Sequence, residues 1–171
     1  STRTPTLFPY TTLFRSLTPA DYFGRTMVEK SPEKVSIGVI NVAIGGCSID
    51  LFDEDKAAAY IAKSADWLQN FCKAYDDNPY RRLIDMAKKA QEAGVIKGIL
   101  LHQGCTDNGQ RDWPDRVKLV YERILADLGL EAERCPLYVG ELMSQQDNGI
   151  CSLHNSVIAS MPLVIPTAHV V

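Results

Sequence analysis

Short apolar runs alternate along this sequence with longer segments that have the spacing of amphipathic helices. The runs are rich in Val, Ile and Leu, each has the length of a strand, and they span residues 34–46, 95–104, 135–142 and 163–171. Continuous apolar strands separated by helices are typical of a parallel sheet covered on both faces. The sequence therefore predicts an α/β fold of three layers, α/β/α, with a mainly parallel sheet.

Proline, glycine and polar residues mark the ends of the segments between these runs. Pro19 suits the first turn of a helix, and Gly94 and Gly129 suit the residue that follows one. We expect helices over residues 19–30, 53–74, 80–93, 114–128 and 153–160. The fourth of these helices carries an apolar stripe, made of Val117, Val120, Tyr121, Ile124 and Leu128.

The composition is that of a single globular domain and excludes several classes of partner. The chain has 171 residues, of which 46% are apolar and 23% charged. A net charge of −3 argues against a nucleic-acid surface, and no apolar run reaches the roughly 18 residues of a membrane span. The five cysteines have no CxxC spacing and the three histidines are far apart, so we expect free thiols and no metal site.

Chemistry in a parallel sheet is expected at the C-terminal ends of the strands. Those ends carry "GGCSID" (45–50), "HQGCTDNG" (102–109) and "GELMSQQDN" (140–148). Neither GxxxxGK[ST], GxGxxG nor GxSxG occurs, so a nucleotide site, a dinucleotide site and a nucleophile elbow have no support.

In the first loop, Gly45 and Gly46 could present backbone N–H groups to an oxyanion. The alternative is a tight strand-to-helix turn in which the glycines serve only the backbone conformation. Ser48 could be a nucleophile, but a helix-capping hydroxyl is the favoured interpretation because no base is identifiable beside it.

The second loop is the sharper signal, because interior packing does not require so many polar residues at a strand end. The amide of Gln103 could donate to a developing negative charge. Cys105 could be a thiol nucleophile with His102 or His154 as its base. The alternative is a polar loop that caps the next helix, with Cys105 as a small buried filler.

The third loop offers Glu141, which could orient a substrate or be an ordinary strand-end carboxylate. Trp67 and Trp113 are expected to serve core or lid packing rather than to be sugar platforms.

The segments "NVAIGGCSIDLF", "HQGCTDNGQRDWPDRVKLVYERILADLGL", "CPLYVGEL" and "VIPTAHVV" together resemble the SGNH-like carbohydrate esterases of family six. This is the group of acetylxylan esterases and sialate O-acetylesterases, and the resemblance covers residues 17–171. It implies an SGNH-hydrolase, flavodoxin-like α/β/α fold without a cofactor. It also implies an acetylated glycan as the substrate and a secreted or periplasmic location.

The resemblance assigns roles to residues of the first two loops. Gly46 matches the oxyanion glycine of the family, and His102, Gln103 and Gly104 match the start of its HQGE motif. Gln103 is then a further oxyanion donor, and Cys105 stands where the family often has a glutamate that orients the catalytic histidine. Four polar residues are candidates for binding the substrate: His102, Asp107, Asn108 and Glu141.

Two motifs of the family are missing from these 171 residues. The nucleophilic serine of the family lies in a GQSN motif and its histidine in a DxxHF-like motif, and neither occurs here. His169 falls in the strand before the second motif, so it does not match the catalytic histidine. We therefore expect a fragment of one esterase domain over residues 17–171, incomplete at both ends and without useful activity.

Residues 1–16 do not fit the pattern that follows them. A DNA string widely used as a sequencing-library adapter translates in one frame to TLFPYTTLFRS, which is identical to residues 6–16. A targeting peptide would need a basic start and a longer apolar core. We therefore predict that residues 1–16 are derived from an adapter and are not part of the domain.

Two other functions remain open from the sequence. A thiol-dependent hydrolase that uses Cys105 predicts loss of activity on alkylation. A non-catalytic glycan-binding or structural domain predicts that the chain binds sugar without turnover.

Overall fold

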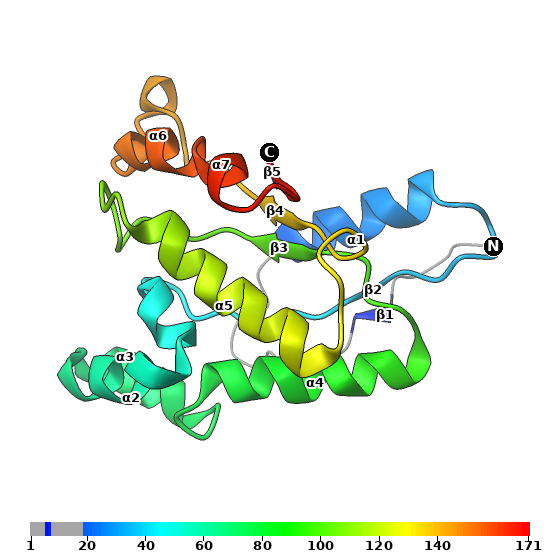
Figure 1. Cartoon of the computed structure of the whole chain (residues 1–171), viewed down its shortest axis with the longest axis horizontal. Coiled ribbons are helices and arrows are strands. Elements are labelled where there is room, and N and C mark those ends of the chain that lie inside the picture. Colours follow the sequence, from blue (N-terminus) through cyan, green and yellow to red (C-terminus); the bar gives the residue numbers. More distant parts are fainter. Residues whose placement is uncertain (1–5, 8–18) are drawn as a thin grey trace. The chain divides into compact units, whose positions relative to one another are not determined.

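The computed structural model of the chain describes residues 6–7 and 19–171 (Figure 1). It divides into two compact units, Ser1–Ala43 and Ile44–Val171. The predicted adapter-derived segment therefore lies outside the described residues except for Thr6 and Leu7, and its origin stays a prediction.

In the described part of the first unit there are two very short strands and one helix. Strand β1 (Thr6–Leu7) pairs in parallel with β2 (Gly38–Val39), and α1 spans Pro19–Lys30. The predicted helix 19–30 is confirmed at both ends. The predicted strand 34–46 is reduced to Gly38 and Val39, which are the residues that pair with the described residues of β1.

The second unit carries the remaining elements. Its strands are β3 (Ile99–Leu101), β4 (Leu137–Val139) and β5 (Ala168–Val170). Its α-helices are α2 (Glu54–Lys63), α3 (Asp66–Lys73), α4 (Pro79–Ala93), α5 (Trp113–Leu128), α6 (Asn155–Ile158) and α7 (Met161–Val164). Its 3₁₀ helices are η1 (Ile49–Phe52), η2 (Gln145–Asp147) and η3 (Ser152–His154).

The sheet of this unit is parallel, in the order β3-β4-β5, which confirms the α/β class (Figure 1). Leu100, Tyr138 and His169 form one row across it, and the rings of Tyr138 and His169 stack with centroids 5.2 Å apart. Leu100 is 47% exposed. The expectation that each apolar run is buried on both faces is therefore wrong for this row, although Leu137 and Val139 of β4 are buried.

Helix α5 carries the core of the second unit, as its sequence pattern predicts. All five residues of the predicted stripe are buried. Gly129 ends the helix with φ +63°, a left-handed conformation that glycine adopts without strain. Helix α4 begins at Pro79, with the Asn78 side chain accepting from Arg81 N as its cap.

Three further predicted elements differ from the structure. The helix expected over 153–160 is the 3₁₀ helix η3 followed by the four-residue α6. The single helix expected over 53–74 is two helices, because Ser64 has an extended backbone and its hydroxyl donates to Tyr60 O, 2.7 Å away. The strand expected over 163–171 begins only at Ala168, since α7 takes up its first residues.

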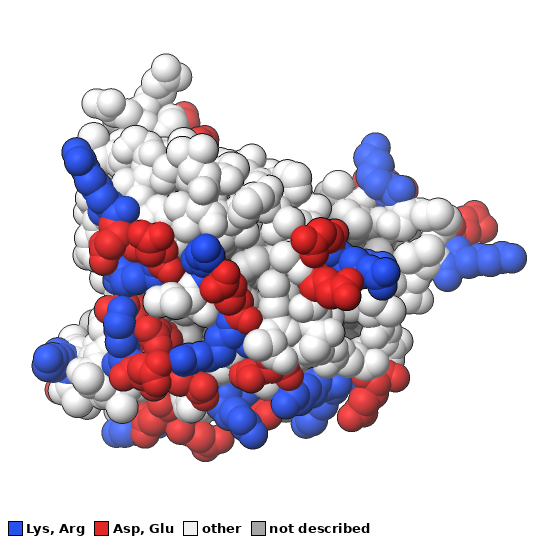
Figure 2. All heavy atoms as spheres, viewed as in Figure 1, with Lys and Arg blue, Asp and Glu red and all other residues white. Residues whose placement is uncertain are grey.

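Charge is distributed unevenly along the second unit. On the face shown in Figure 2, acidic and basic side chains gather over α2 to α5 and are sparse over α6 and α7. Residues 142–171 contain a single charged residue, Asp147. Among the described residues, no helix is both long and apolar enough to cross a membrane.

Candidate active site

The loops at Gly46 and after β3 lie against each other in the second unit. Thr106 Oγ1 donates to Gly46 O over 2.7 Å, and Gln103 Nε2 donates to Cys47 O over 3.0 Å. The structure therefore brings together the two loops that the sequence marks as oxyanion candidates, although 56 to 60 residues separate the bonded pairs.

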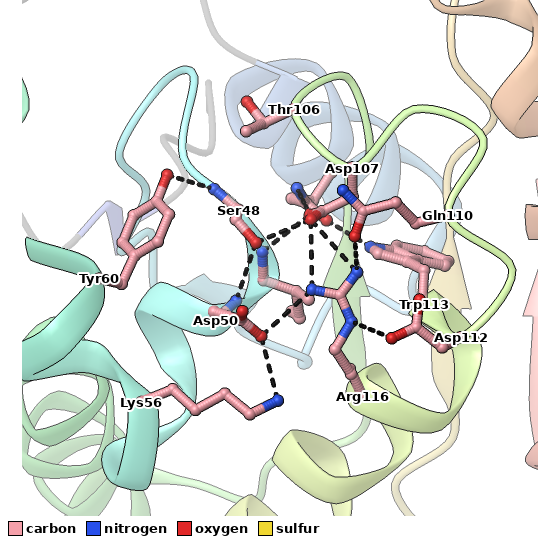
Figure 3. Close-up of polar contacts among 12 residues, drawn as sticks. Ser48, Asp50, Lys56, Tyr60, Thr106, Asp107, Gln110, Asp112, Trp113 and Arg116 are labelled. Atoms are coloured by element: carbon pink, nitrogen blue, oxygen red, sulfur yellow. Dashed lines mark hydrogen bonds and ion pairs between the residues drawn. The ribbon is translucent and has the colours of Figure 1, made fainter. Parts of the chain in front are cut away.

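Asp107 is the centre of the polar network that joins these loops (Figure 3). Its carboxylate is 1% exposed and accepts from Ser48 Oγ at 2.7 Å, Ile49 N at 2.9 Å and Gln103 Nε2 at 2.7 Å. Arg116 approaches the same carboxylate with Nη1 and Nη2, each 3.3 Å from Oδ1. A buried charge is tolerated when donors surround it in this way.

Arg116, on α5, connects this network to three further side chains. Its Nη1 lies 3.2 Å from Asp50 Oδ1, Nη2 donates to Gln110 Oε1, and Nε is 3.3 Å from Asp112 Oδ2 (Figure 3). Nε forms an ion pair with Asp112 but has no hydrogen-bond partner among the described residues. Burial alone would lower the pKa of Arg116, but Asp50 and Asp107 raise it above its ordinary value.

Ser48 serves as a cap, which confirms the favoured interpretation of its hydroxyl. Its Oγ accepts from Asp50 N at the start of η1 and donates to Asp107. Its own N–H donates to Tyr60 Oη over 2.9 Å, and the residue is buried. These bonds hold the chain that follows Gly46 in one conformation.

The side-chain amide of Gln103 has a fixed orientation. Its Oε1 accepts from Trp113 Nε1 at 2.6 Å, which leaves Nε2 to donate to Cys47 O and to Asp107. Both hydrogens of Nε2 are thus used within the protein. Oxyanion donation by Gln103 stays a prediction, and it requires one of these bonds to be exchanged for the substrate.

Gly46 lies at an exposed turn with φ +74°. A Cβ at this position would lie 3.1 Å from Cη2 of Trp67, which shows how closely the indole approaches the backbone. Trp67 is 51% exposed, whereas Trp113 is fully buried. The expectation of core packing is confirmed for Trp113, and Trp67 instead forms an exposed aromatic surface beside Gly46.

Gly104 is required by its contact with His154. Its φ is +147°, and a Cβ there would lie 2.3 Å from His154 Cδ2. His154 is fully buried, packs edge-on against Trp113 at 4.7 Å and accepts from Gly109 N through Nδ1. The neutral ring must then carry its proton on Nε2, which has no partner among the described residues. Burial lowers the pKa of His154.

Cys105 is exposed, and its thiol contacts Cys151 rather than a histidine. The hydrogen bond that the Cys105 thiol donates to Cys151, together with partial burial, raises the pKa of Cys105 to about 11. A thiol nucleophile requires the opposite shift, towards the thiolate. His154 is engaged with Gly109, so the thiol-dependent alternative gains no support from this geometry.

The four candidate substrate-binding residues are placed in two different ways. His102, Asn108 and Glu141 are exposed: His102 directly follows β3, Asn108 lies in the loop after it, and Glu141 lies just after β4. The ring of His102 lies against Gly140, where a Cβ would be 3.0 Å from His102 Cδ2. Asp107 is buried and its oxygens are occupied by protein donors, so it supports the loop and offers the substrate no surface.

Arg116 and Tyr60 belong to the network but were not singled out from the sequence. Arg116 is half-buried on α5, between the exposed Asp115 and the buried Val117, nine residues after Asp107. That spacing across a loop and a helix start follows no motif. The sequence shows Arg116 only as a basic residue in an amphipathic helix, and basic residues are common in such helices.

A serine–histidine pair is not formed by residues 19–171: the hydroxyl of Ser48 bonds to Asp107, and no other serine there is hydrogen-bonded to a histidine. Over the same residues, no group of three or more His, Cys, Asp or Glu is placed to hold a metal ion.

Comparison with known proteins gives one family. The model of a family described as "Carbohydrate esterase, sialic acid-specific acetylesterase" matches residues 2–171. No solved structure matches the chain. The matched range covers nearly the whole chain and includes both loops of the site.

Proposed function

This chain belongs to the carbohydrate esterase family of sialic acid-specific acetylesterases, and we propose that it is part of an enzyme that hydrolyses O-acetyl esters on glycans. Sialic acids are the first candidate substrate and acetylated xylan the second. The observation that carries the proposal is the family match over residues 2–171. The meeting of the Gly46 and Gln103 loops supports it, because both loops carry groups suited to ester hydrolysis.

The chemical role proposed for Gly46 follows from the reaction. Attack on an acetyl ester places negative charge on the carbonyl oxygen, and a preorganised N–H donor stabilises that charge. Gly46 lies at an exposed turn, and its carbonyl is held by Thr106. Its backbone is therefore positioned in advance, which is the condition for this form of catalysis.

The nucleophile is proposed to be a serine outside these 171 residues. Serine acyl-enzyme chemistry needs a serine within hydrogen-bond reach of a base. Ser48 is buried and bonded to Asp107, and it has no histidine beside it. We therefore expect the chain as given to have no useful esterase activity.

Trp67 is proposed to contact the sugar. Exposed indole faces stack on apolar faces of sugar rings, and half of this side chain is open to solvent directly beside Gly46. Its position would place a sugar ring next to the proposed oxyanion site.

The test compares the chain as given with the complete reading frame from the source DNA. Acetate release is measured from O-acetylated sialic acid, acetylxylan and an aryl acetate. We expect release by the complete protein and none by the chain as given. Absence of release by the complete protein, together with retained binding of the sugar, would replace the esterase proposal by a glycan-binding function.

Gly46→Ala and Gly45→Ala in the complete protein form a matched pair. An alanine at position 46 would be strained at φ +74° and would press on Trp67, whereas a Cβ at Gly45 meets nothing within 4 Å. Alanine keeps the backbone N–H, so the strain would act by moving this donor out of position, and complete loss of an oxyanion donor costs about 10²–10³ in kcat. We expect a loss of up to that order for Gly46→Ala and little change for Gly45→Ala. Equal activities would contradict the role of Gly46.

A further inference from the structure

Cys105 and Cys151 lie together although 46 residues separate them in the chain. Cys105 belongs to the loop after β3, and Cys151 immediately precedes η3. The Cys151 thiol donates to Cys105 O over 3.9 Å, and the Cys105 thiol donates in turn to the Cys151 sulfur. We propose that these two cysteines form a reversible disulfide that joins the loop after β3 to the segment after β4.

The surroundings of the five cysteines favour this pair over any other. Cys47, Cys72 and Cys135 are buried, and Cys47 and Cys72 lie inside one apolar cluster. Cys105 is exposed, so a dissolved oxidant can reach its sulfur. Cys151 is 9% exposed and is reached from Cys105 itself. One accessible thiol in contact with a sheltered one is the arrangement in which a mixed disulfide resolves internally.

The oxidant in this reaction is a low-molecular-weight disulfide such as oxidised glutathione, which accepts two electrons from the two protein thiols. The Cys105 thiolate attacks one sulfur of that disulfide, the S–S bond breaks, and one glutathione thiolate leaves. The Cys151 thiolate then attacks the Cys105 sulfur and releases the second glutathione. The two protein thiols lose two protons and two electrons, and one glutathione disulfide becomes two glutathione thiols.

The disulfide would act on the site through the loop that contains Gln103 and Gly104. That loop already contacts Gly46 through Thr106 and packs on His154 through Gly104. A covalent bond at Cys105, between Gly104 and Thr106, would add a further attachment to this loop. It would also remove the only exposed thiol among the described residues.

The pH dependence of the reaction follows from the contact between the thiols. The pKa of Cys105, raised to about 11 by the Cys151 contact and by burial, leaves little thiolate at neutral pH. Below that pKa the thiolate fraction rises about tenfold per pH unit. Oxidation should therefore be slow near neutrality and accelerate towards about pH 9.

The test incubates the folded chain with oxidised glutathione at about pH 8.5 and blocks the remaining thiols with iodoacetamide. Digestion with trypsin and Glu-C without reduction separates the cysteines, because cleavage after Glu141 divides Cys135 from Cys151. We expect residues 98–111 linked to residues 142–171 in one mass. The melting temperature should rise by roughly 5–10 °C, as expected for closing a loop of this length.

Cys105→Ser and Cys151→Ser should each abolish the linked mass and the rise in melting temperature, and Cys135→Ser should preserve both. Glutathione carried stably on Cys105 with Cys151 alkylated would overturn the proposal. So would a Cys47–Cys72 link in place of the expected one, or the absence of any disulfide among the five cysteines. Each result is independent of whether the esterase proposal holds, since no acetyl substrate is involved.

Discussion

The loops that follow β3 and β4 leave the same edge of one sheet but are held in different ways. The loop after β3 is held by Asp107, whose buried carboxylate accepts from two segments of chain. The loop after β4 is held mainly by backbone turns and by Asn155, whose amide bonds both N and O of Leu142. Its two acidic residues, Glu141 and Asp147, are both exposed, and the Asp147 carboxylate accepts from Ser144 at the surface.

This difference means that the loop after β3 is held in one conformation, whereas the loop after β4 is less constrained. A buried ionic network has one arrangement that satisfies all its members, so it holds the groups around it in place. The loop after β4 instead exposes Met143 and Ile150, which are 64% and 92% exposed. We infer that fixed chemical groups are presented by the first loop, while the second offers an apolar surface beside it.

The largest expected effect comes from Asp107→Ala. The substitution leaves Arg116 without one of its partners and removes the acceptor of Ser48 and Ile49. Breaking a buried charge pair costs about 3–5 kcal/mol. We expect a loss of that order in the free energy of unfolding, followed in urea by tryptophan fluorescence.

Asp147→Ala is the control in the other loop, where surface substitutions change stability by about 0.5 kcal/mol or less. Asp107→Asn, which keeps one oxygen acceptor, should fall between the two. Similar losses for Asp107→Ala and Asp147→Ala would remove the distinction between the loops.

Gly104→Ala should give the next largest effect. The new Cβ would meet His154 at 2.3 Å and require a left-handed φ, and such overpacking and strain each cost about 1–3 kcal/mol. Gly109→Ala is matched to it, because Gly109 has φ +76° but nothing within 4 Å of its Cβ position. Thermal unfolding should show the larger loss at position 104. The double variant Gly104→Ala, His154→Ala should recover the part of the loss that is due to the clash, and no recovery would assign the cost to the backbone alone.

A smaller effect is expected from the protonation of His154. Its folded pKa lies below the unfolded value of about 6.5, because burial outweighs the charge of Asp107, and Arg116 acts in the same direction as burial. The unfolded state then binds more protons between these two values, so stability is complete above about pH 6.5 and falls as the pH is lowered through that window. Unfolding free energies at several pH values should show a shallower fall for His154→Gln than for the unchanged chain. Identical curves would mean that His154 does not carry this dependence.

The smallest effect is expected in the loop after β4. Ile150→Ser should change the free energy of unfolding by about 0.5 kcal/mol or less, because the side chain is 92% exposed. Urea unfolding measures it. A loss above about 1 kcal/mol would show that Ile150 is packed in solution and that this loop is not the looser of the two.

Local and periodic features could be predicted from the sequence. The stripe of α5 and its end at Gly129 follow from helical spacing and from the backbone freedom of glycine. The order of strands and helices follows from the alternation of apolar runs. The two loops of the site could be named because polar residues at strand ends have no packing reason.

What could not be predicted depends on contacts between distant residues. In the sequence, Asp107 looks like an ordinary acidic residue of a loop. Its contacts with Ser48 and Arg116 exist only in the folded chain. The break at Ser64 depends on one hydroxyl that bonds back to the preceding turn, which an alanine-rich helical pattern conceals. Trp67 and Trp113 have similar surroundings in sequence, and tertiary structure alone makes the first exposed and the second buried.

The most direct measurement is a double-mutant cycle between Ser48→Ala and Asp107→Asn in urea unfolding. Bonded residues couple by about 0.5–3 kcal/mol, whereas distant sites add within about 0.5 kcal/mol. We predict coupling in the first range for this pair, because the 2.7 Å bond joins the Gly46 turn to the loop after β3. Ser48→Ala with Asp147→Ala, the distant control, should be additive. Additivity of Ser48→Ala with Asp107→Asn would contradict the claim that Asp107 holds the two loops of the site together.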